Sequence, residues 1–162
     1  MWAQLNRGQW TRQCRERLDL AGVNVLRVVP DAGPVIWGAR TLLGDDASAS
    51  EWRYLPVRRL SLFIEESIDE GTQWAAVEPN GEAMWAELRR LVSTFLHELF
   101  RAGAFQGGAP REAYFVKCDA QTTKAREIEA GQTKVVVGFA PLKPAEFVVL
   151  EVMVKTAGPD GE

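Results

Sequence analysis

The stretch 81–102 constrains the fold more than any other part of the sequence. Its apolar residues recur every three or four positions, as on the buried side of a helix, and Trp85, Val92 and Leu96 widen the apolar stripe. The stripe itself consists of Met84, Leu88, Leu91, Phe95, Leu99 and Ala102. We therefore expect a helix that is buried on more than one side and that begins at Asn80 as its N-cap.

A second amphipathic helix is predicted from Pro56 to Gly71, because proline suits the first helical turn and glycine the stop. Its charges oppose the helix dipole, with basic residues early and acidic residues late. These residues are Arg58, Arg59, Glu65, Glu66, Asp69 and Glu70. A partner of complementary charge explains the arrangement, and so does a solvated acidic end. Catalysis or a metal site is disfavoured, because successive turns of one exposed face enclose neither substrate nor ion.

Short β-like segments flank the two helices. They lie at 23–29, 35–37, 113–118, 133–140 and 145–154. Strands on both sides of a helix pair predict an α+β fold: an α/β sandwich with a small mixed sheet packed against the two main helices. The final strand either completes its own sheet or adds to the edge of another subunit's sheet, as an exchange strand.

The remaining segments define the expected domain limits. Residues 1–21 are predicted to form an irregular arm or short helix, and 22–154 one domain that includes the terminal strand 145–154. Residues 44–50 and the stretch before Gly131 have the composition of surface loops. We expect 155–162 to be a disordered tail.

Composition excludes several classes of partner. An apolar fraction of 46% with 25% charged residues is typical of a globular protein, and a net charge of −3 disfavours a nucleic-acid partner. Residues 1–60 carry +3 and the remaining residues −6, which suits charge-complementary contacts between copies. The sequence has neither a membrane-length apolar run nor the pattern of a signal peptide, so we expect a cytoplasmic protein.

The sequence contains none of the usual catalytic or ligand-binding motifs. It lacks phosphate-binding loops, nucleophile elbows, calcium loops and zinc spacings. Cys14 and Cys118 are too isolated to indicate a disulfide framework, and Cys118 is expected to be a small buried residue. His97, the only histidine, has no nucleophile beside it in sequence. We therefore expect no enzyme activity, no cofactor and no metal.

Six consecutive segments together resemble one family. They are GVNVLR (22–27), VIWGARTL (35–42), WRYLPVRRL (52–60), EESIDEGTQWAAVEP (65–79), AYFVKCD (113–119) and GFAPLKPAEF (138–147). In order and spacing they are similar to the C-terminal domain of contractile phage tail sheath proteins, which also occurs in pyocins and other contractile injection systems. The resemblance covers roughly residues 20–154 and is more specific than any short motif.

This resemblance implies a structural subunit that polymerises in helical rings around an inner tube and contracts by rearrangement of subunits linked by exchanged strands. It implies other sheath subunits and the inner tube protein as partners, with baseplate or terminator proteins as further candidates, within an assembled phage tail or injection particle. The implied strand-exchange residues are Phe147, Val148, Val149, Leu150 and Val152. The six charged residues of the 56–71 helix become candidate contacts with subunits or tube.

Two alternatives remain at this point. Because a fold does not fix a function, the scaffold suits a small α/β enzyme or ligand-binding module. Because family subunits are generally longer, the chain also fits a truncated, non-assembling sheath remnant. For an assembling subunit, we expect deletion of residues 145–162 to abolish assembly and to leave a folded domain.

Overall fold

We describe the fold from a computed structural model, which covers residues 2–4, 11–142 and 147–157. The chain divides into two compact units, Met1–Leu60 and Ser61–Glu162, and the boundary falls inside helix α2 (Leu55–Gly71). The expectation of one domain over 22–154 stays a prediction. Each unit is described by itself below.

The first unit contains a three-stranded sheet in the order β1-β2-β3. Strand β2 (Asn24–Val29) pairs antiparallel with β3 (Gly33–Trp37), as the predicted strands at 23–29 and 35–37 require. Strand β1 (Trp2–Gln4) pairs parallel with β2 and was not predicted. Helix α1 (Arg12–Leu20) is the expected short helix, and the Thr11 hydroxyl accepts a hydrogen bond from the backbone N–H of Cys14.

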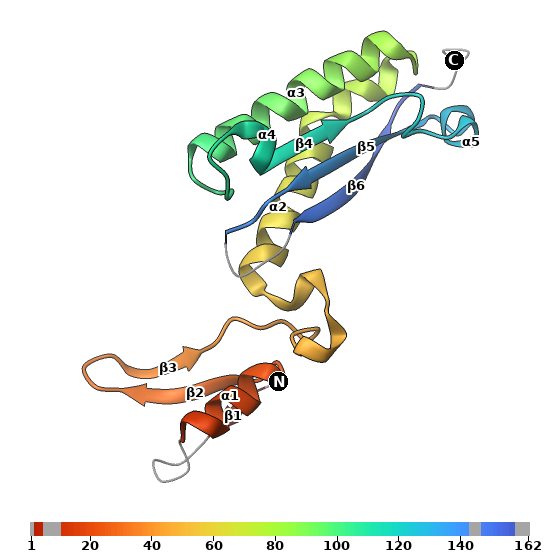
Figure 1. Ribbon diagram of the computed structural model, residues 1–162. Helices are drawn as coiled ribbons and strands as arrows, with labels where there is room; N and C mark the ends of the chain where they lie inside the picture. The colour runs from red at the N-terminus through yellow and green to blue at the C-terminus, as the bar shows by residue number, and fades with distance from the viewer. Residues whose placement is uncertain (1, 5–10, 143–146, 158–162) are drawn as a thin grey trace. The chain divides into compact units, whose positions relative to one another are not determined.

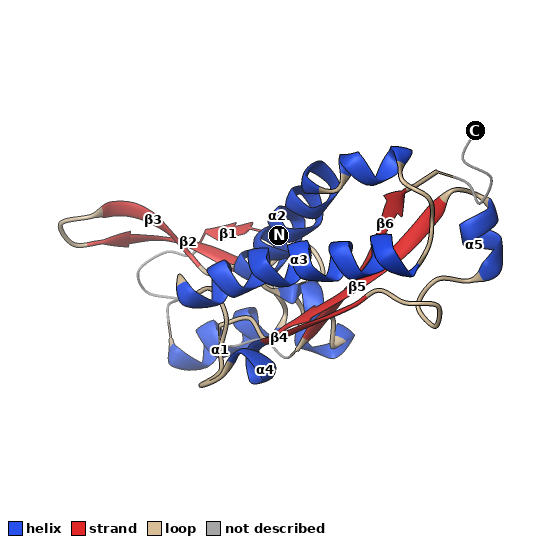
Figure 2. Ribbon diagram, turned by 90° about the horizontal axis from the view of Figure 1, so that it is seen from above, coloured by secondary structure: helices blue, strands red, loops and turns tan. Residues whose placement is uncertain are grey.

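The second unit has the expected sandwich architecture. Strands β4 (Tyr114–Lys117), β5 (Gln132–Phe139) and β6 (Val148–Lys155) form an antiparallel sheet in the order β4-β5-β6. Helix α3 (Glu82–Arg101) and the later turns of α2 lie along one face of this sheet (Figures 1 and 2). The α+β class is confirmed. The sheet under the helices is antiparallel, however, and the mixed sheet is the one in the first unit.

The core of the second unit lies between this sheet and the two helices. Strand β6 alternates strictly between buried and exposed residues, as a strand with one covered face must. The fully buried side chains include Ile64 and Ile68 of α2, Leu88, Val92 and Leu96 of α3, Val135, Val137 and Phe139 of β5, and Val148 of β6. The buried face of α3 differs from the expected stripe. Its buried residues are Met84, Trp85, Leu88, Val92 and Leu96, whereas Leu91, Phe95 and Leu99 are half-buried and Ala102 is exposed.

The predicted cap of α3 is wrong. The N-cap is Gly81, which makes no side-chain capping bond, and the backbone N–H of Trp85 donates to the Gly81 carbonyl. The side chain of Asn80 is turned instead toward strands β5 and β6, where it makes several hydrogen bonds. Tertiary contacts have replaced the local cap.

The C-terminal segment completes its own sheet. Of the two alternatives for 145–154, the structure has β6 paired with β5 over its whole length, from Gln132↔Lys155 to Phe139↔Val148. Order continues past the expected boundary, because β6 includes Lys155 and Thr156 is buried. Residues 158–162 lie outside the described residues, as do 143–146. The expected loop before Gly131 contains a short helix, α5 (Ala125–Glu129), and another short helix, α4 (Pro110–Ala113), precedes β4.

Gly22 joins α1 to β2 by a glycine-specific turn. It has φ +71°, its N–H donates to the Asp19 carbonyl, and the N–H of Val23 donates to the Leu18 carbonyl, which is the Schellman pattern at a helix end. A Cβ atom on residue 22 would lie 2.5 Å from the backbone carbon of Gly44. Both the conformation and the close approach therefore require glycine.

We expect Gly22→Ala to destabilise the first unit far more than Gly33→Ala. Both residues have φ near +70°, so each substitution costs about 1 kcal/mol for the left-handed conformation. A Cβ on residue 33 meets no atom within 4 Å, whereas a Cβ on residue 22 adds a backbone clash worth about 1–3 kcal/mol. Urea denaturation followed by tryptophan fluorescence measures the difference, and equal losses for the two variants would contradict the packing argument.

Candidate functional site

The candidate exchange residues of β6 divide between the two faces of its sheet. Val148, Leu150 and Val152 are buried in the core of their own unit. Phe147 and Val149 are 44% and 47% exposed on the opposite, outer face. Only these two side chains are therefore open to a partner while β6 occupies its own sheet.

An aromatic pair covers a glycine on this outer face. Phe115 lies directly opposite Gly138 in the β4–β5 register, and the rings of Phe115 and Phe147 stack with centroids 5.7 Å apart and planes 8° apart. A Cβ on residue 138 would lie 2.2 Å from the Phe115 ring. The missing side chain of Gly138 thus leaves the space in which the two rings lie.

Strand β6 is also an edge strand. In the order β4-β5-β6 it pairs with β5 alone, and its C-terminal end is followed by a single bridge between Ala157 and Pro79. Within the described ranges, no second strand pairs with it. An edge strand presents backbone N–H and C=O groups to which another strand can add.

The two arginines of α2 lie near its start and the four acidic residues lie near its end. The Arg58 guanidinium lies 4.8 Å from the centre of the Trp52 ring, and Arg59 is exposed. Glu66, Asp69 and Glu70 are exposed and Glu65 is half-buried. In the part of the chain that the structure describes, none of these four carboxylates forms an ion pair. Their charge is therefore not neutralised by any residue within the described ranges.

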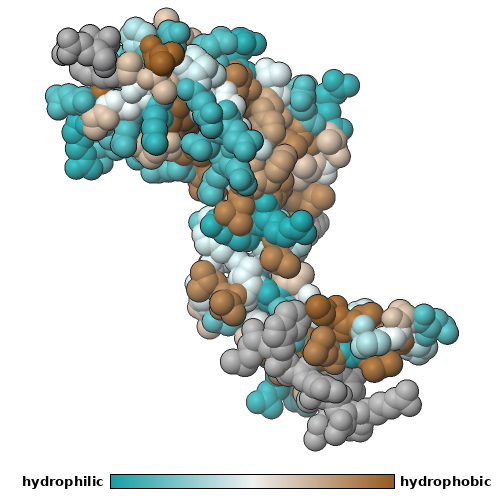
Figure 3. Space-filling model, turned by 180° about the vertical axis from the view of Figure 1, so that it is seen from behind, coloured by the Kyte–Doolittle hydropathy of each residue, from teal (hydrophilic) through white to brown (hydrophobic). Residues whose placement is uncertain are grey.

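The sequence reasoning missed an exposed apolar patch on the β2–β3 hairpin. Leu26 and Ile36 are register partners, and both are exposed, as is Val28. Figure 3 shows apolar residues gathered over this hairpin. The available signal was the composition of β2, whose residues are apolar on both faces apart from Arg27 and Asn24. A strand that is apolar on both faces exposes one of them when only one is covered.

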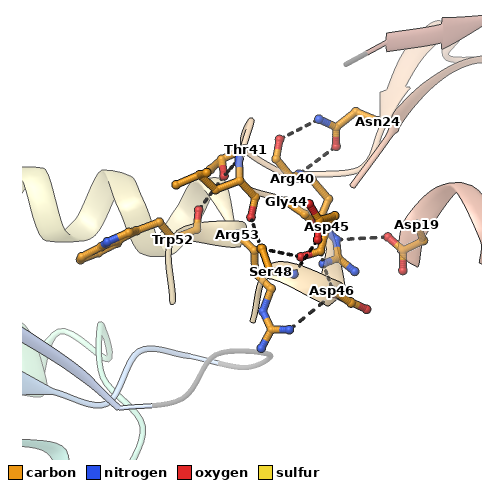
Figure 4. A network of polar contacts seen from close by, with 11 residues as sticks. Asp19, Asn24, Arg40, Thr41, Gly44, Asp45, Asp46, Ser48, Trp52 and Arg53 are labelled. Carbon is orange, nitrogen blue, oxygen red and sulfur yellow. Dashed lines mark hydrogen bonds and ion pairs between the residues drawn. The ribbon is translucent and has the colours of Figure 1, made fainter. Parts of the chain in front are cut away.

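A polar network centred on Arg40 was also missed (Figure 4). Arg40 is buried, and its main chain exchanges two hydrogen bonds with the Asn24 side chain, at 2.8 Å and 2.7 Å. Its guanidinium donates to the Gly44 carbonyl at 3.0 Å and to the carboxylates of Asp46 and Asp19 at 2.6 Å and 3.4 Å. These bonds hold the loop that follows β3 against β2 and α1.

The electrostatics of this network are those of a structural cluster. The hydrogen bond from Arg40 holds the pKa of the Asp46 carboxyl below its ordinary value of 3.8, and Arg53 lies 3.5 Å from the same oxygen. Burial alone would lower the pKa of Arg40, but its bonds to Asp46 and Asp19 raise it. Charges that are locked in this way position a loop and supply no nucleophile or base.

Of the remaining reactive groups, Cys118 is buried and His97 is exposed. Burial raises the pKa of the Cys118 thiol to about 12, so the thiol stays protonated at neutral pH. His97 Nδ1 lies 3.1 Å from the Tyr114 hydroxyl. Among the residues that the structure describes, no three His, Cys, Asp or Glu side chains gather as metal ligands, and no helix has the length and apolarity needed to cross a membrane.

Comparisons with known proteins agree on one family. A family model described as the phage tail sheath C-terminal domain matches residues 47–155. A chain in the cryo-EM structure of the anti-feeding prophage (AFP) baseplate is 37% identical with a TM-score of 0.71, and the match covers 87% of this chain and 38% of that one. A chain in the contracted sheath complex of the extracellular contractile injection system PVC is 35% identical with a TM-score of 0.70, over 87% and 39% of the two chains.

A more distant structure shares the fold. The sheath tail protein of Listeria innocua is 15% identical with a TM-score of 0.63, and the match covers 92% of this chain and 34% of that one. The chain spans about two fifths of the length of the AFP and PVC chains it matches. No curated protein matches it.

The Arg40 network predicts a pH-dependent difference between the wild type and Asp46→Asn. A carboxyl with a lowered pKa in the folded state stabilises the fold above its unfolded pKa, and this contribution is lost as the pH falls through the lowered value. The wild type should therefore be the more stable protein at pH 7, and the difference should shrink below pH 3.8 until it vanishes.

Urea denaturation at several pH values between 7 and 2.5 measures this difference. Glu51→Gln, which removes an exposed carboxylate from the same unit, is the matched control. A difference for Asp46→Asn that persists undiminished at the lowest pH would contradict the assigned role of Arg40.

Proposed function

We propose, since the chain belongs to the phage tail sheath C-terminal domain family, that it is a structural subunit of a contractile sheath that polymerises in helical rings around an inner tube. The family match carries this proposal, because it spans the two main helices and the whole β4–β5–β6 sheet. The relatives at 35–37% identity come from an injection-system baseplate and a contracted sheath. The proposed role is structural and needs no catalytic residue.

Strand β6 is the proposed link between subunits, through Phe147, Val148, Val149, Leu150 and Val152. A neighbour's β6 that replaced the chain's own on β5 would make identical contacts, so the exchange costs little free energy. A link made of main-chain hydrogen bonds also survives a rigid-body rearrangement in which other faces repack.

The acidic end of α2 is the proposed electrostatic contact. Glu65, Glu66, Asp69 and Glu70 carry negative charge that no described group of the chain neutralises. A basic surface on a neighbouring sheath subunit or on the inner tube protein fits it, and Arg58 and Arg59 offer the opposite charge. Baseplate or terminator proteins are further proposed partners, within a particle assembled in the cytoplasm.

Deletion of residues 145–162 would not separate loss of the strand link from loss of the fold. The inward side chains of β6 belong to the core, so their removal would destabilise the domain itself. A cross-link between copies avoids this problem. Val136 and Glu151 are register partners on the outer face of β5 and β6, and Cα atoms of directly paired residues lie within disulfide range.

We expect a mixture of Val136→Cys and Glu151→Cys copies to form an intermolecular disulfide. In both proteins Cys14 is replaced by serine, whereas Cys118 stays because it is buried and protonated. Strand exchange holds the two thiols at an effective concentration in the millimolar range. The disulfide-linked dimer should therefore form faster than it does by random collision at micromolar protein, by on the order of a hundredfold. Non-reducing electrophoresis and light scattering measure the cross-link and the assembly.

A copy with Val77→Cys in place of Glu151→Cys is the control for collision, because Val77 is exposed on the same unit. If both mixtures gave the same yield, β6 would not be the link. If light scattering found a monomer at every concentration, the polymerising role itself would be wrong for this chain.

We also expect neutralisation of the acidic end of α2 to weaken assembly. Glu66→Gln with Glu70→Gln removes two exposed charges, and assembly should then need a several-fold higher protein concentration, because each close charge pair contributes up to about 1 kcal/mol. Glu98→Gln with Glu129→Gln removes the same charge from exposed positions elsewhere. Equal effects of the two pairs in light scattering would indicate net charge rather than a specific contact.

A further inference from the structure

The apolar pattern of β6 leaves its register incompletely specified. Its inward side chains are aliphatic at every second position, from Val148 through Leu150 and Val152 to Val154. A slip by one residue would turn the whole row toward solvent, but a slip by two would place one aliphatic side chain where another had been. Hydrophobic burial therefore excludes a slip by one residue but does not exclude a slip by two residues.

The next inward position is polar. Thr156 follows Val154 in the same alternation and is only 8% exposed. Its backbone N–H donates to the Gly131 carbonyl at 2.8 Å, and its hydroxyl oxygen lies 3.0 Å from Asn80 Nδ2, which donates to it. Thr156 is thus the one inward residue at this end of β6 that a neighbouring aliphatic residue cannot replace.

Asn80 is held rigidly in position to make this contact. Its Nδ2 also donates to the Gln132 carbonyl at 3.1 Å, and its Oδ1 accepts from Trp85 Nε1 and from the Thr133 hydroxyl, each at 2.8 Å. The amide therefore uses both donors and both acceptor positions. Since Trp85 belongs to α3 and Thr133 to β5, the donor that faces β6 is fixed by elements other than β6.

A two-residue slip breaks this arrangement. It would bring Val154 beside Asn80, and the half-buried amide would lose its hydrogen bond to the Thr156 hydroxyl, which a valine side chain cannot replace. At the other end of β6, the ring of Phe147 stacks on Phe115, and the same slip would move Phe147 to the position of Val149, opposite Gly138 and beside Phe115, so part of that apolar contact would be kept. The polar contact therefore discriminates between the two registers more sharply.

We infer that the Asn80 amide is a docking site for Thr156 that determines the register of β6, whichever copy of the chain supplies the strand. In the folded chain the site binds its own Thr156. In assembly, and here the inference rests on the proposed function, the same amide binds the Thr156 of a second copy. The site gives strand exchange a fixed register that the repetitive apolar row does not provide.

Disulfide trapping within one chain tests the register directly. Val136→Cys with Glu151→Cys reports the native register, and Val136→Cys with Val149→Cys reports the slip that brings Val154 to Asn80. In the second protein, Thr156→Val should raise the rate of disulfide formation about fivefold, the factor expected for one hydrogen bond. Thr156→Ser keeps the hydroxyl and should restore the slow rate.

Two further variants separate register from general loosening. Thr133→Val removes another hydrogen bond to the same Asn80 amide, but Thr133 stays beside Asn80 in either register, so the slipped disulfide should not form faster. Asn80→Asp loses the donors toward Thr156 and toward the Gln132 carbonyl, but its carboxylate can accept from the Thr156 hydroxyl, so it should raise the rate less than Thr156→Val does. The inference is overturned if Thr156→Val leaves the rate unchanged, or if Thr133→Val raises it equally.

The same cysteines placed on separate copies test the docking between chains. A mixture of Val136→Cys and Val149→Cys copies should cross-link about fivefold faster when the copy that carries Val149→Cys also carries Thr156→Val. If no mixture cross-links in either register, the proposed exchange fails, while the single-chain result still decides the role of Asn80. If the slipped mixture cross-links equally with Thr156 present, the site does not select the register between copies.

Discussion

The burial of one face of β5 and β6 against α2 and α3 is the constraint on which the second unit depends. Neither strand has a stable place without the other, because the inward side chains of both fill the same space. Each fully buried aliphatic side chain contributes about 1.5–3 kcal/mol. A β6 strand must therefore occupy this position at all times, and the proposed assembly changes which copy provides it.

The opposite face of the same sheet and the exposed side of α2 carry side chains that are not part of the core. Phe147 and Val149 are accessible, and the carboxylates of α2 have no described ion-pair partner. The exposed part of the aromatic pair and the unpaired carboxylates remain accessible on the isolated domain. They are consistent with a chain whose surfaces serve contacts with other chains.

The first unit is organised differently. Of its described side chains, Val25 and Val57 are the buried aliphatic ones, while Asn24 and Arg40 are buried and polar. Hydrogen bonds and ion pairs around Arg40, together with the tight turn at Gly22, hold its loop in place. Such a cluster specifies one geometry, because a buried charge tolerates few other arrangements.

The sequence by itself determined the two helices, most of the strands and the family. Repeats of 3.6 and 2 residues are local, so they show which residues of α3 or β6 face inward without knowledge of the partner. The family segments are likewise continuous stretches of chain. The short β1 and α5 lacked such a signal because they are too brief to establish a period.

Only the tertiary structure decided what those elements contact. It turned Asn80 from the expected helix cap into a contact for Thr156, 76 residues away, and it brought Arg40 to Asn24 across the β2–β3 hairpin. It also placed β6 on its own β5 and left the hairpin patch exposed. These outcomes depend on hydrogen bonds and packing between distant residues, and a local repeat carries no information about which distant group completes them.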